Sequence, residues 1–132
     1  MDRQLQERLY VYEQEKLASR QVVSLVRDIL LWLEHTSLHS CTEKNAGPFA
    51  SHLLLALMRM QRGELLGVAW SHHVHEEAMG LTSFIPWVEH IQREVKQVLG
   101  FTLPSEEFDF LLLHIGAFMA HHYDSFLSTE KQ

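Results

Sequence analysis

Residues 48–63 read PFASHLLLALMRMQRG, and the expected fold class follows from this segment. Apolar side chains occupy nearly the whole circumference of a helix over 48–61, where an exposed helix would carry only one apolar stripe. A helix of that kind is buried by neighbours on several sides. Pro48 suits a first helical turn, and Gly63 follows the last apolar residue. The sequence therefore predicts a central helix that other helices cover.

The flanking segments show the same helical period, without convincing strand alternation. Helices are expected at about 2–17, 18–34, 68–79, 84–99 and 104–125, with a polar loop over 35–47 and a glycine cap at Gly100. We predict an all-α protein, a compact bundle of five or six helices. Its expected divisions are an N-terminal helical extension (1–17), one helical domain (18–125) and a frayed tail (126–132).

Composition excludes several classes of function. The chain has 132 residues, 46% of them hydrophobic, and a formal charge of -6 without a basic stripe, so direct nucleic-acid binding is not expected. The apolar runs are far shorter than the ~20 residues that a membrane span needs. Cys41 is the sole cysteine, so no disulfide can form within the chain and its thiol is expected to be inert. We expect a cytoplasmic protein with no membrane insertion.

Two motifs add more specific information. The first runs from Ser51-His52 to Arg59 and Gly63, and the second reads LPSEEFDFLLLHI over 103–115. Together they resemble the PTS regulation domain (PRD), which has a His-(Ile/Leu)…Ala…Arg…Gly helix followed by Pro-x-x-Glu, an aromatic residue and Leu-His-Ile. The resemblance covers residues 18–122. The chain departs from the family pattern at Ser51, where an acidic residue is usual, and at Asp109, where glycine is usual.

The resemblance implies a helical bundle that dimerises and is regulated by reversible phosphorylation of histidines. It maps the phosphorylated histidines onto His52 and His114, and the second motif is the more complete. The implied partners are phosphotransferase-system proteins (HPr or sugar-specific components) and PRD-containing transcription regulators. The chain is thus expected to be a stand-alone regulator of transcription control linked to the carbohydrate phosphotransferase system. It is not expected to be an enzyme or to need a cofactor.

The spacing of charged residues leads to a packing hypothesis. Arg59 follows His52 by seven residues, and Glu107 precedes His114 by seven. If the two helices pack antiparallel with the histidines adjacent, Arg59 should approach Glu107 and the pair should fix the register. The alternatives are that both charges face water and that each histidine is an ordinary core residue with a satisfied hydrogen bond.

Other side chains allow further interpretations. His72 with Glu76, and His73 with Glu77, have metal-ligand spacing, but no complete ligand set is local, so no metal site is predicted. Aromatic side chains could line a ligand pocket, although core packing is their commoner role: Trp32, Trp70, Phe84, Trp87, Phe110 and Phe118. The alternative functions are a small-molecule or metal-sensing bundle and a dimerisation module without a working phospho-switch.

Overall fold

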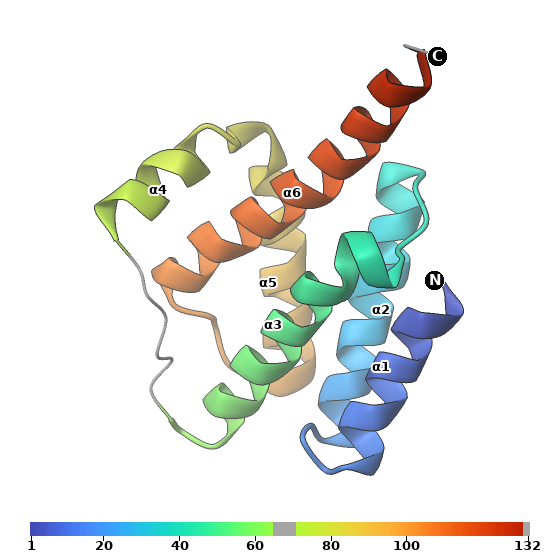
Figure 1. The fold of residues 1–132 in the computed structure, drawn as a ribbon. Helices are drawn as coiled ribbons and strands as arrows, with labels where there is room; N and C mark the ends of the chain where they lie inside the picture. Colours follow the sequence, from blue (N-terminus) through green and yellow to red (C-terminus); the bar gives the residue numbers. More distant parts are fainter. Residues whose placement is uncertain (65–70, 131–132) are drawn as a thin grey trace.

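The computed structural model describes residues 1–64 and 71–130, with side chains as far as His121. The predicted all-α class is confirmed, because these residues form six α-helices, one 3₁₀ helix (η1) and no strand (Figure 1). The elements are α1 (Arg3–Gln14), α2 (Arg20–Ser37), α3 (Glu43–Gln61), α4 (His72–Met79), η1 (Thr82–Phe84), α5 (Ile85–Leu99) and α6 (Ser105–Glu130).

Short polar residues occupy the N-cap positions of several helices. The Ser19 and Ser71 hydroxyls accept hydrogen bonds from backbone N–H groups in the first turns of α2 and α4. These bonds satisfy donors that the first turn of a helix leaves without intrahelical partners. Gly100 ends α5 with a φ of 82°, which glycine adopts without the steric cost of a Cβ. The predicted glycine cap is therefore confirmed.

The central helix begins earlier than predicted, at Glu43 and not at Pro48. The Thr42 hydroxyl accepts from the Asn45 backbone N–H, and Oδ1 of Asn45 accepts from the Thr42 backbone N–H, so the two residues form a capping box. Gly47, which was expected to end the loop, and Pro48, which was expected to open the helix, both lie inside the helix. Because α2 also continues to Ser37, the predicted loop over 35–47 shortens to 38–42.

The core is a single cluster of buried apolar side chains centred on α3. In α3 the buried residues extend around most of the helix, as predicted: Ala46, Gly47, Phe49, Ala50, Leu53, Leu54, Ala56, Leu57 and Met58. Leu5 and Leu9 of α1 are fully buried in the same cluster. Residues 1–17, which the sequence suggested as an extension, therefore pack on the rest of the domain.

Helices α3 and α6 lie side by side and run in roughly opposite directions, with α4 against the N-terminal half of α6 (Figure 1). The packing hypothesis assumed an antiparallel contact between segments 48–61 and 104–125, and that contact is present. Helix α6 continues to Glu130, five residues past its predicted end, and residues 131–132 and Trp70 lie outside the described part. None of the described helices is both long and apolar enough to cross a membrane.

Candidate functional site

The two histidines singled out from the sequence meet where α3 packs on α6. The ring centroids of His52 and His114 are 5.0 Å apart, and the ring planes are inclined by 39°. Phe110 lies 5.8 Å from His52, and Phe49 lies 5.8 Å from His114. The predicted adjacency of the histidines is therefore confirmed, within an aromatic cluster at the helix–helix contact.

Glu107 is the acidic partner of this cluster. Its side chain is only 1% exposed, and its Oε2 lies 2.7 Å from Nε2 of His52. The other carboxylate oxygen, Oε1, is buried and has no hydrogen-bond partner among the described residues. An unpaired buried carboxylate oxygen carries a desolvation cost, so the contact with His52 is the main compensation for burying Glu107.

The predicted approach of Arg59 to Glu107 is wrong. Arg59 is exposed, and Glu107 pairs with His52 instead. The reason is the register: His52 contacts both Glu107 and His114, so it lies opposite the middle of the stretch that separates them. Arg59 lies two helical turns, about 10.5 Å, beyond His52 on α3. Because the helices are antiparallel, this displacement places Arg59 close to or past the start of α6.

The contact with Glu107 selects a tautomer of His52. An ionised carboxylate can only accept, so Nε2–H donates and Nδ1 retains the lone pair. The His52 side chain is 25% exposed, which leaves the ring partly open to a reactant. A buried carboxylate that orients an imidazole also stabilises the positive charge that appears when the other nitrogen acts as a nucleophile.

His114 has a different electrostatic environment. Burial, and after it the nearby His52, lower the pKa of His114 to about 4, although Glu107 acts in the opposite direction. At neutral pH the ring is therefore uncharged, as expected of a nucleophilic histidine.

A second histidine–carboxylate pair, not predicted from the sequence, joins α4 to α6. Nδ1 of His75 lies 2.8 Å from Oδ2 of Asp109, whose side chain is 7% exposed. Asp109 stands at the position where the family has glycine, which was the one available signal. Its partner is 34 residues away on a separate helix, so no local pattern could identify the pair.

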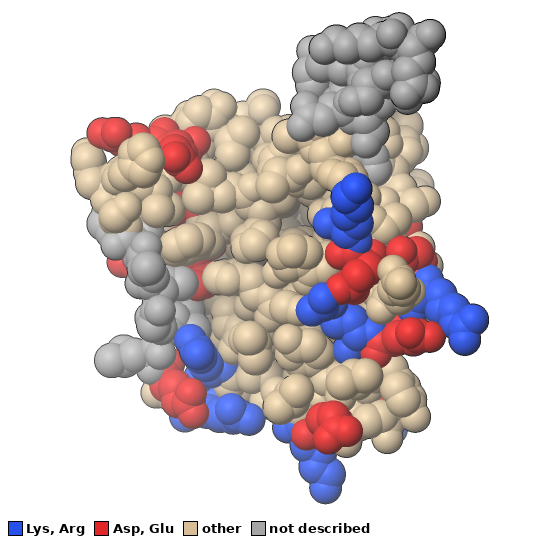
Figure 2. Space-filling model, in the orientation of Figure 1, with Lys and Arg blue, Asp and Glu red and all other residues tan. Residues whose placement is uncertain are grey.

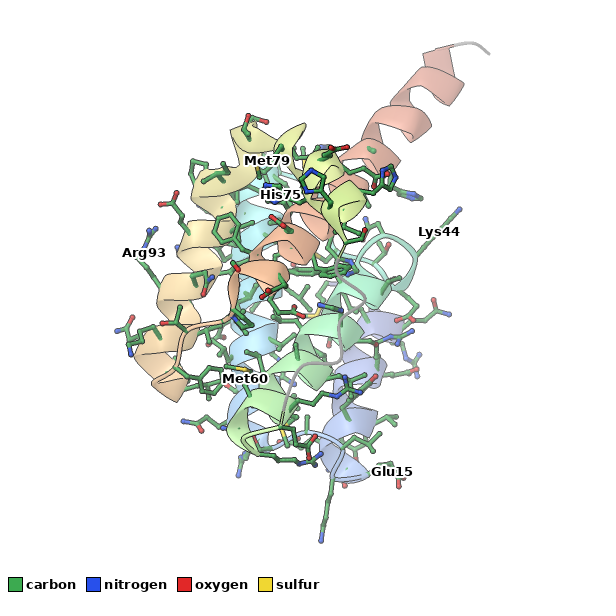
Figure 3. The ribbon with its side chains drawn as sticks, turned by 90° about the vertical axis from the view of Figure 1, so that its left-hand side faces the viewer. Glu15, Lys44, Met60, His75, Met79 and Arg93 are labelled. Carbon is green, nitrogen blue, oxygen red and sulfur yellow. The ribbon has the colours of Figure 1, made fainter. Side chains whose placement is uncertain are left out.

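The second pair borders an open groove of about 510 Å³ between α4, α5 and the start of α6. Figure 3 shows His75 and Met79 on α4 above the N-terminal half of α6. The remaining lining residues are Gln92, Leu103, Ser105, Phe108 and Asp109. The groove is mainly apolar and has a few polar groups, a combination common in small-molecule sites.

The other candidate sites offer less. Among the side chains of residues 1–64 and 71–121, no cluster of three or more histidine, cysteine or acidic groups could hold a metal ion. Trp32 stacks on His90 and meets Trp87 edge-on, so these aromatics pack α2 against α5. Burial raises the pKa of the Cys41 thiol to about 12, which keeps it protonated and unreactive.

One face of the molecule, over α3 and α6, is poor in charge. In Figure 2 the acidic and basic side chains lie mainly towards the edges, and a broad uncharged area covers the middle of the face formed by α3 and α6. An uncharged face of this kind suits contact with another protein better than contact with nucleic acid.

Comparison with protein-family models, with curated proteins and with solved structures finds no significant match to this chain.

Proposed function

We propose that this chain is a PRD-like regulatory domain that accepts phosphate on His52, with His114 as its neighbour and alternative acceptor. The observation that carries the proposal is the His52–Glu107 pair: a partly exposed imidazole held at 2.7 Å by a buried carboxylate. The donor in this proposal is a phosphohistidine of a phosphotransferase-system protein, which agrees with the motifs around His52 and His114.

The transfer needs no group beyond the two proteins. The Nδ1 lone pair of His52 attacks phosphorus and forms an N–P bond, while the N–P bond of the donor breaks and its electron pair stays on the donor imidazole. The His52 ring is then positively charged, with its proton on Nε2 facing Glu107. The Glu107 carboxylate stabilises that charge, and the proton passes through it or through water to the donor imidazole.

Phosphorylation would also disturb the contact between α3 and α6. A phosphoryl group brings nearly two negative charges to a ring that pairs with the buried Glu107. Repulsion between phosphate and carboxylate favours opening of the helix–helix contact. The charge on one side chain is thereby coupled to the arrangement of two helices, as a regulatory domain requires.

The proposed output is protein contact without enzymatic turnover. The uncharged face of α3 and α6 provides a surface for a second copy of the chain or for a PRD-containing transcription regulator (Figure 2). A cytoplasmic homodimer that exchanges phosphate with phosphotransferase proteins is the proposed working form.

The test is incubation with phosphoenolpyruvate and the general phosphotransferase proteins, followed by mass spectrometry under conditions that preserve acid-labile phosphate. We expect label on His52 or His114, and none on these sites when both are replaced by alanine. His52→Ala should remove more label than His114→Ala, because His52 has the carboxylate partner although its motif is the less complete. Absence of label from both residues in the wild-type chain would rule out the proposed switch.

The groove beside α4 favours a second candidate function, a small-molecule sensor. Its volume of about 510 Å³ lies within the range of ligand sites. A screen of small molecules by thermal denaturation tests this function: a ligand that raises the melting temperature should lose its effect in a Phe108→Ala variant.

A further inference from the structure

We propose that His75 is a third phosphoryl-acceptor histidine, and that it takes the phosphoryl group on Nε2 whereas His52 takes it on Nδ1. The inference extends the proposed function, because it assumes histidine phosphorylation of the same chain. It depends on the pair formed by His75 and Asp109, which uses different residues and a different helix from the first pair.

The two pairs hold their rings by opposite nitrogens. Glu107 contacts Nε2 of His52, and Asp109 contacts Nδ1 of His75. When each carboxylate accepts from a ring N–H, the lone pair lies on Nδ1 of His52 but on Nε2 of His75. The geometry thus specifies the isomer of phosphohistidine as well as the residue.

The environment of His75 combines access with activation. Its side chain is 42% exposed, against 25% for His52, while Asp109 is only 7% exposed. A desolvated carboxylate stabilises a developing positive charge on the ring more strongly than a solvated one.

Two neighbours on the same helix provide internal controls. His72 and His73 are more exposed, at 82% and 78%, but their partners Glu76 and Glu77 are themselves 65% and 55% exposed. Exposure alone would therefore favour phosphorylation of His72 and His73, and activation by a buried carboxylate would favour His75.

The step at His75 is a simple displacement. The Nε2 lone pair attacks phosphorus and forms an N–P bond, and the N–P bond of the donor breaks with its electrons going to the donor nitrogen. The ring then carries the phosphoryl group on Nε2 and a proton on Nδ1, directed at Asp109. That proton leaves through Asp109 or water and neutralises the departing donor nitrogen.

The experiment uses two phosphoryl donors on the full chain. Phosphoramidate, a small-molecule donor, measures the reactivity of each histidine without a protein partner; the phosphotransferase proteins measure the biological reaction. With phosphoramidate, we expect His75 to be labelled at least about tenfold faster than His72 and His73. Phosphorus NMR should assign the Nε2 isomer to His75 in a His52→Ala/His114→Ala variant.

Asp109→Asn should remove the rate advantage of His75 over His72 and His73, whereas Asp109→Glu should retain part of it. Circular dichroism checks that both variants fold, and the isomer found on the unsubstituted His75 tests the geometry without altering Asp109. If the rates of phosphoramidate labelling rank by side-chain exposure, with His72 and His73 fastest, the inference is overturned. Detection of the Nδ1 isomer on His75 would overturn it as well.

The two donors separate this inference from the proposed function. Label from the phosphotransferase proteins on His52 or His114, together with slow phosphoramidate labelling of His75, supports the proposed function and overturns the inference. No label from those proteins, together with fast Nε2 labelling of His75 by phosphoramidate, rules out the proposed donor and supports the activation of His75.

Discussion

At the scale of single residues, the site depends on how a buried negative charge is balanced. Glu107 is 1% exposed, one of its carboxylate oxygens has no partner in the described part of the chain, and the other touches His52. A charge in such a position is tolerated only beside a partner that can carry positive charge. The pair is therefore preorganised for a reaction in which the His52 ring becomes cationic.

Replacement of Glu107 by glutamine tests that role. Glutamine keeps the size and an oxygen acceptor but loses the charge, so the fold should survive. Phosphorylation of His52 should slow by about 100-fold, measured by initial rates of labelling. The matched control is Glu106→Gln, at the next position on α6, which should leave the rate unchanged. Equal rates for the Glu107 variant and the wild-type chain would contradict a role for its charge.

The lowered pKa of His114 predicts a pH dependence of stability. The unfolded chain binds a proton at His114 below about pH 6.5, and the folded chain only near pH 4. The unfolded state binds more protons in this window. The contribution of His114 to the free energy of unfolding is therefore fully present above pH 6.5 and is lost as the pH falls towards 4. Between pH 7.5 and 5, this group should cost about 2 kcal/mol of unfolding free energy.

Urea denaturation of the wild-type chain and a His114→Gln variant at the two pH values measures this contribution. The variant should lose about 2 kcal/mol less than the wild-type chain between pH 7.5 and 5. His72→Gln, at a side chain that is 82% exposed, should retain the wild-type pH dependence. A wild-type pH dependence in the His114 variant would refute the assignment.

What could be predicted about these residues depended on distance along the chain. His52 and His114 each lie in a motif, and antiparallel packing brought them together as expected. The predicted partner of Glu107 was wrong, because sequence spacing gives the separation of residues along one helix but not the register between two packed helices. The pairing of His75 with Asp109 depends on where α4 docks, which no motif specifies.

At the scale of elements, helix ends were the least predictable feature. The amphipathic stripes of α2 and α5 gave their positions closely, and Gly100 gave the end of α5. Helix α3 was predicted to start five residues too late because Gly47 is typical of a loop and Pro48 is typical of the first helical turn. The capping box formed by Thr42 and Asn45 outweighed that local preference, with one backbone hydrogen bond lost at proline.

The capping box can be tested by Thr42→Ala. Loss of the hydroxyl leaves a first-turn N–H of α3 without its acceptor, so unfolding should become easier by about 1 kcal/mol. Thr102→Ala is the matched control, because Thr102 is exposed in the connection between α5 and α6. Chemical denaturation measures both, and equal stabilities would show that the box contributes nothing.

At the scale of the whole molecule, α1 belongs energetically to the bundle. Leu5 and Leu9 are fully buried in the common core, and the Arg8 side chain forms an ion pair with Glu43 at the start of α3. The polar composition of residues 2–17 concealed this role, because two buried leucines are few for a helix of that length. Burial of complete leucine side chains nevertheless stabilises a small domain appreciably.

Leu9→Ala should therefore destabilise the entire chain by about 2–5 kcal/mol, since it leaves a cavity between α1, α2 and α3. Tyr10→Ala, at a neighbouring residue that is 60% exposed, should change stability by less than about 0.5 kcal/mol. Thermal denaturation should show a single transition in both variants. A Leu9 variant as stable as the Tyr10 variant would mean that α1 is dispensable.

Two copies of the chain are expected to associate through the face of α3 and α6. An uncharged face covers α3 and α6 in Figure 2, and Leu55, three residues after His52 on α3, is 43% exposed. A contact between two copies that buries Leu55 removes its apolar surface from water and lies close to His52 on the same helix. Light scattering should give twice the 15.4 kDa chain mass at roughly tens of micromolar, a range in which moderate affinities populate a dimer.

Leu55→Glu should restore the monomer mass, because it buries an unpaired charge in the proposed interface. Leu31→Glu is the matched control, since Leu31 is similarly exposed, at 47%, but lies on α2. Phosphorylation at His52 should act as Leu55→Glu does, because it also adds negative charge to this face. A monomer mass for the unmodified chain would refute the dimer, and dissociation by the α2 variant alone would place the contact on a different face.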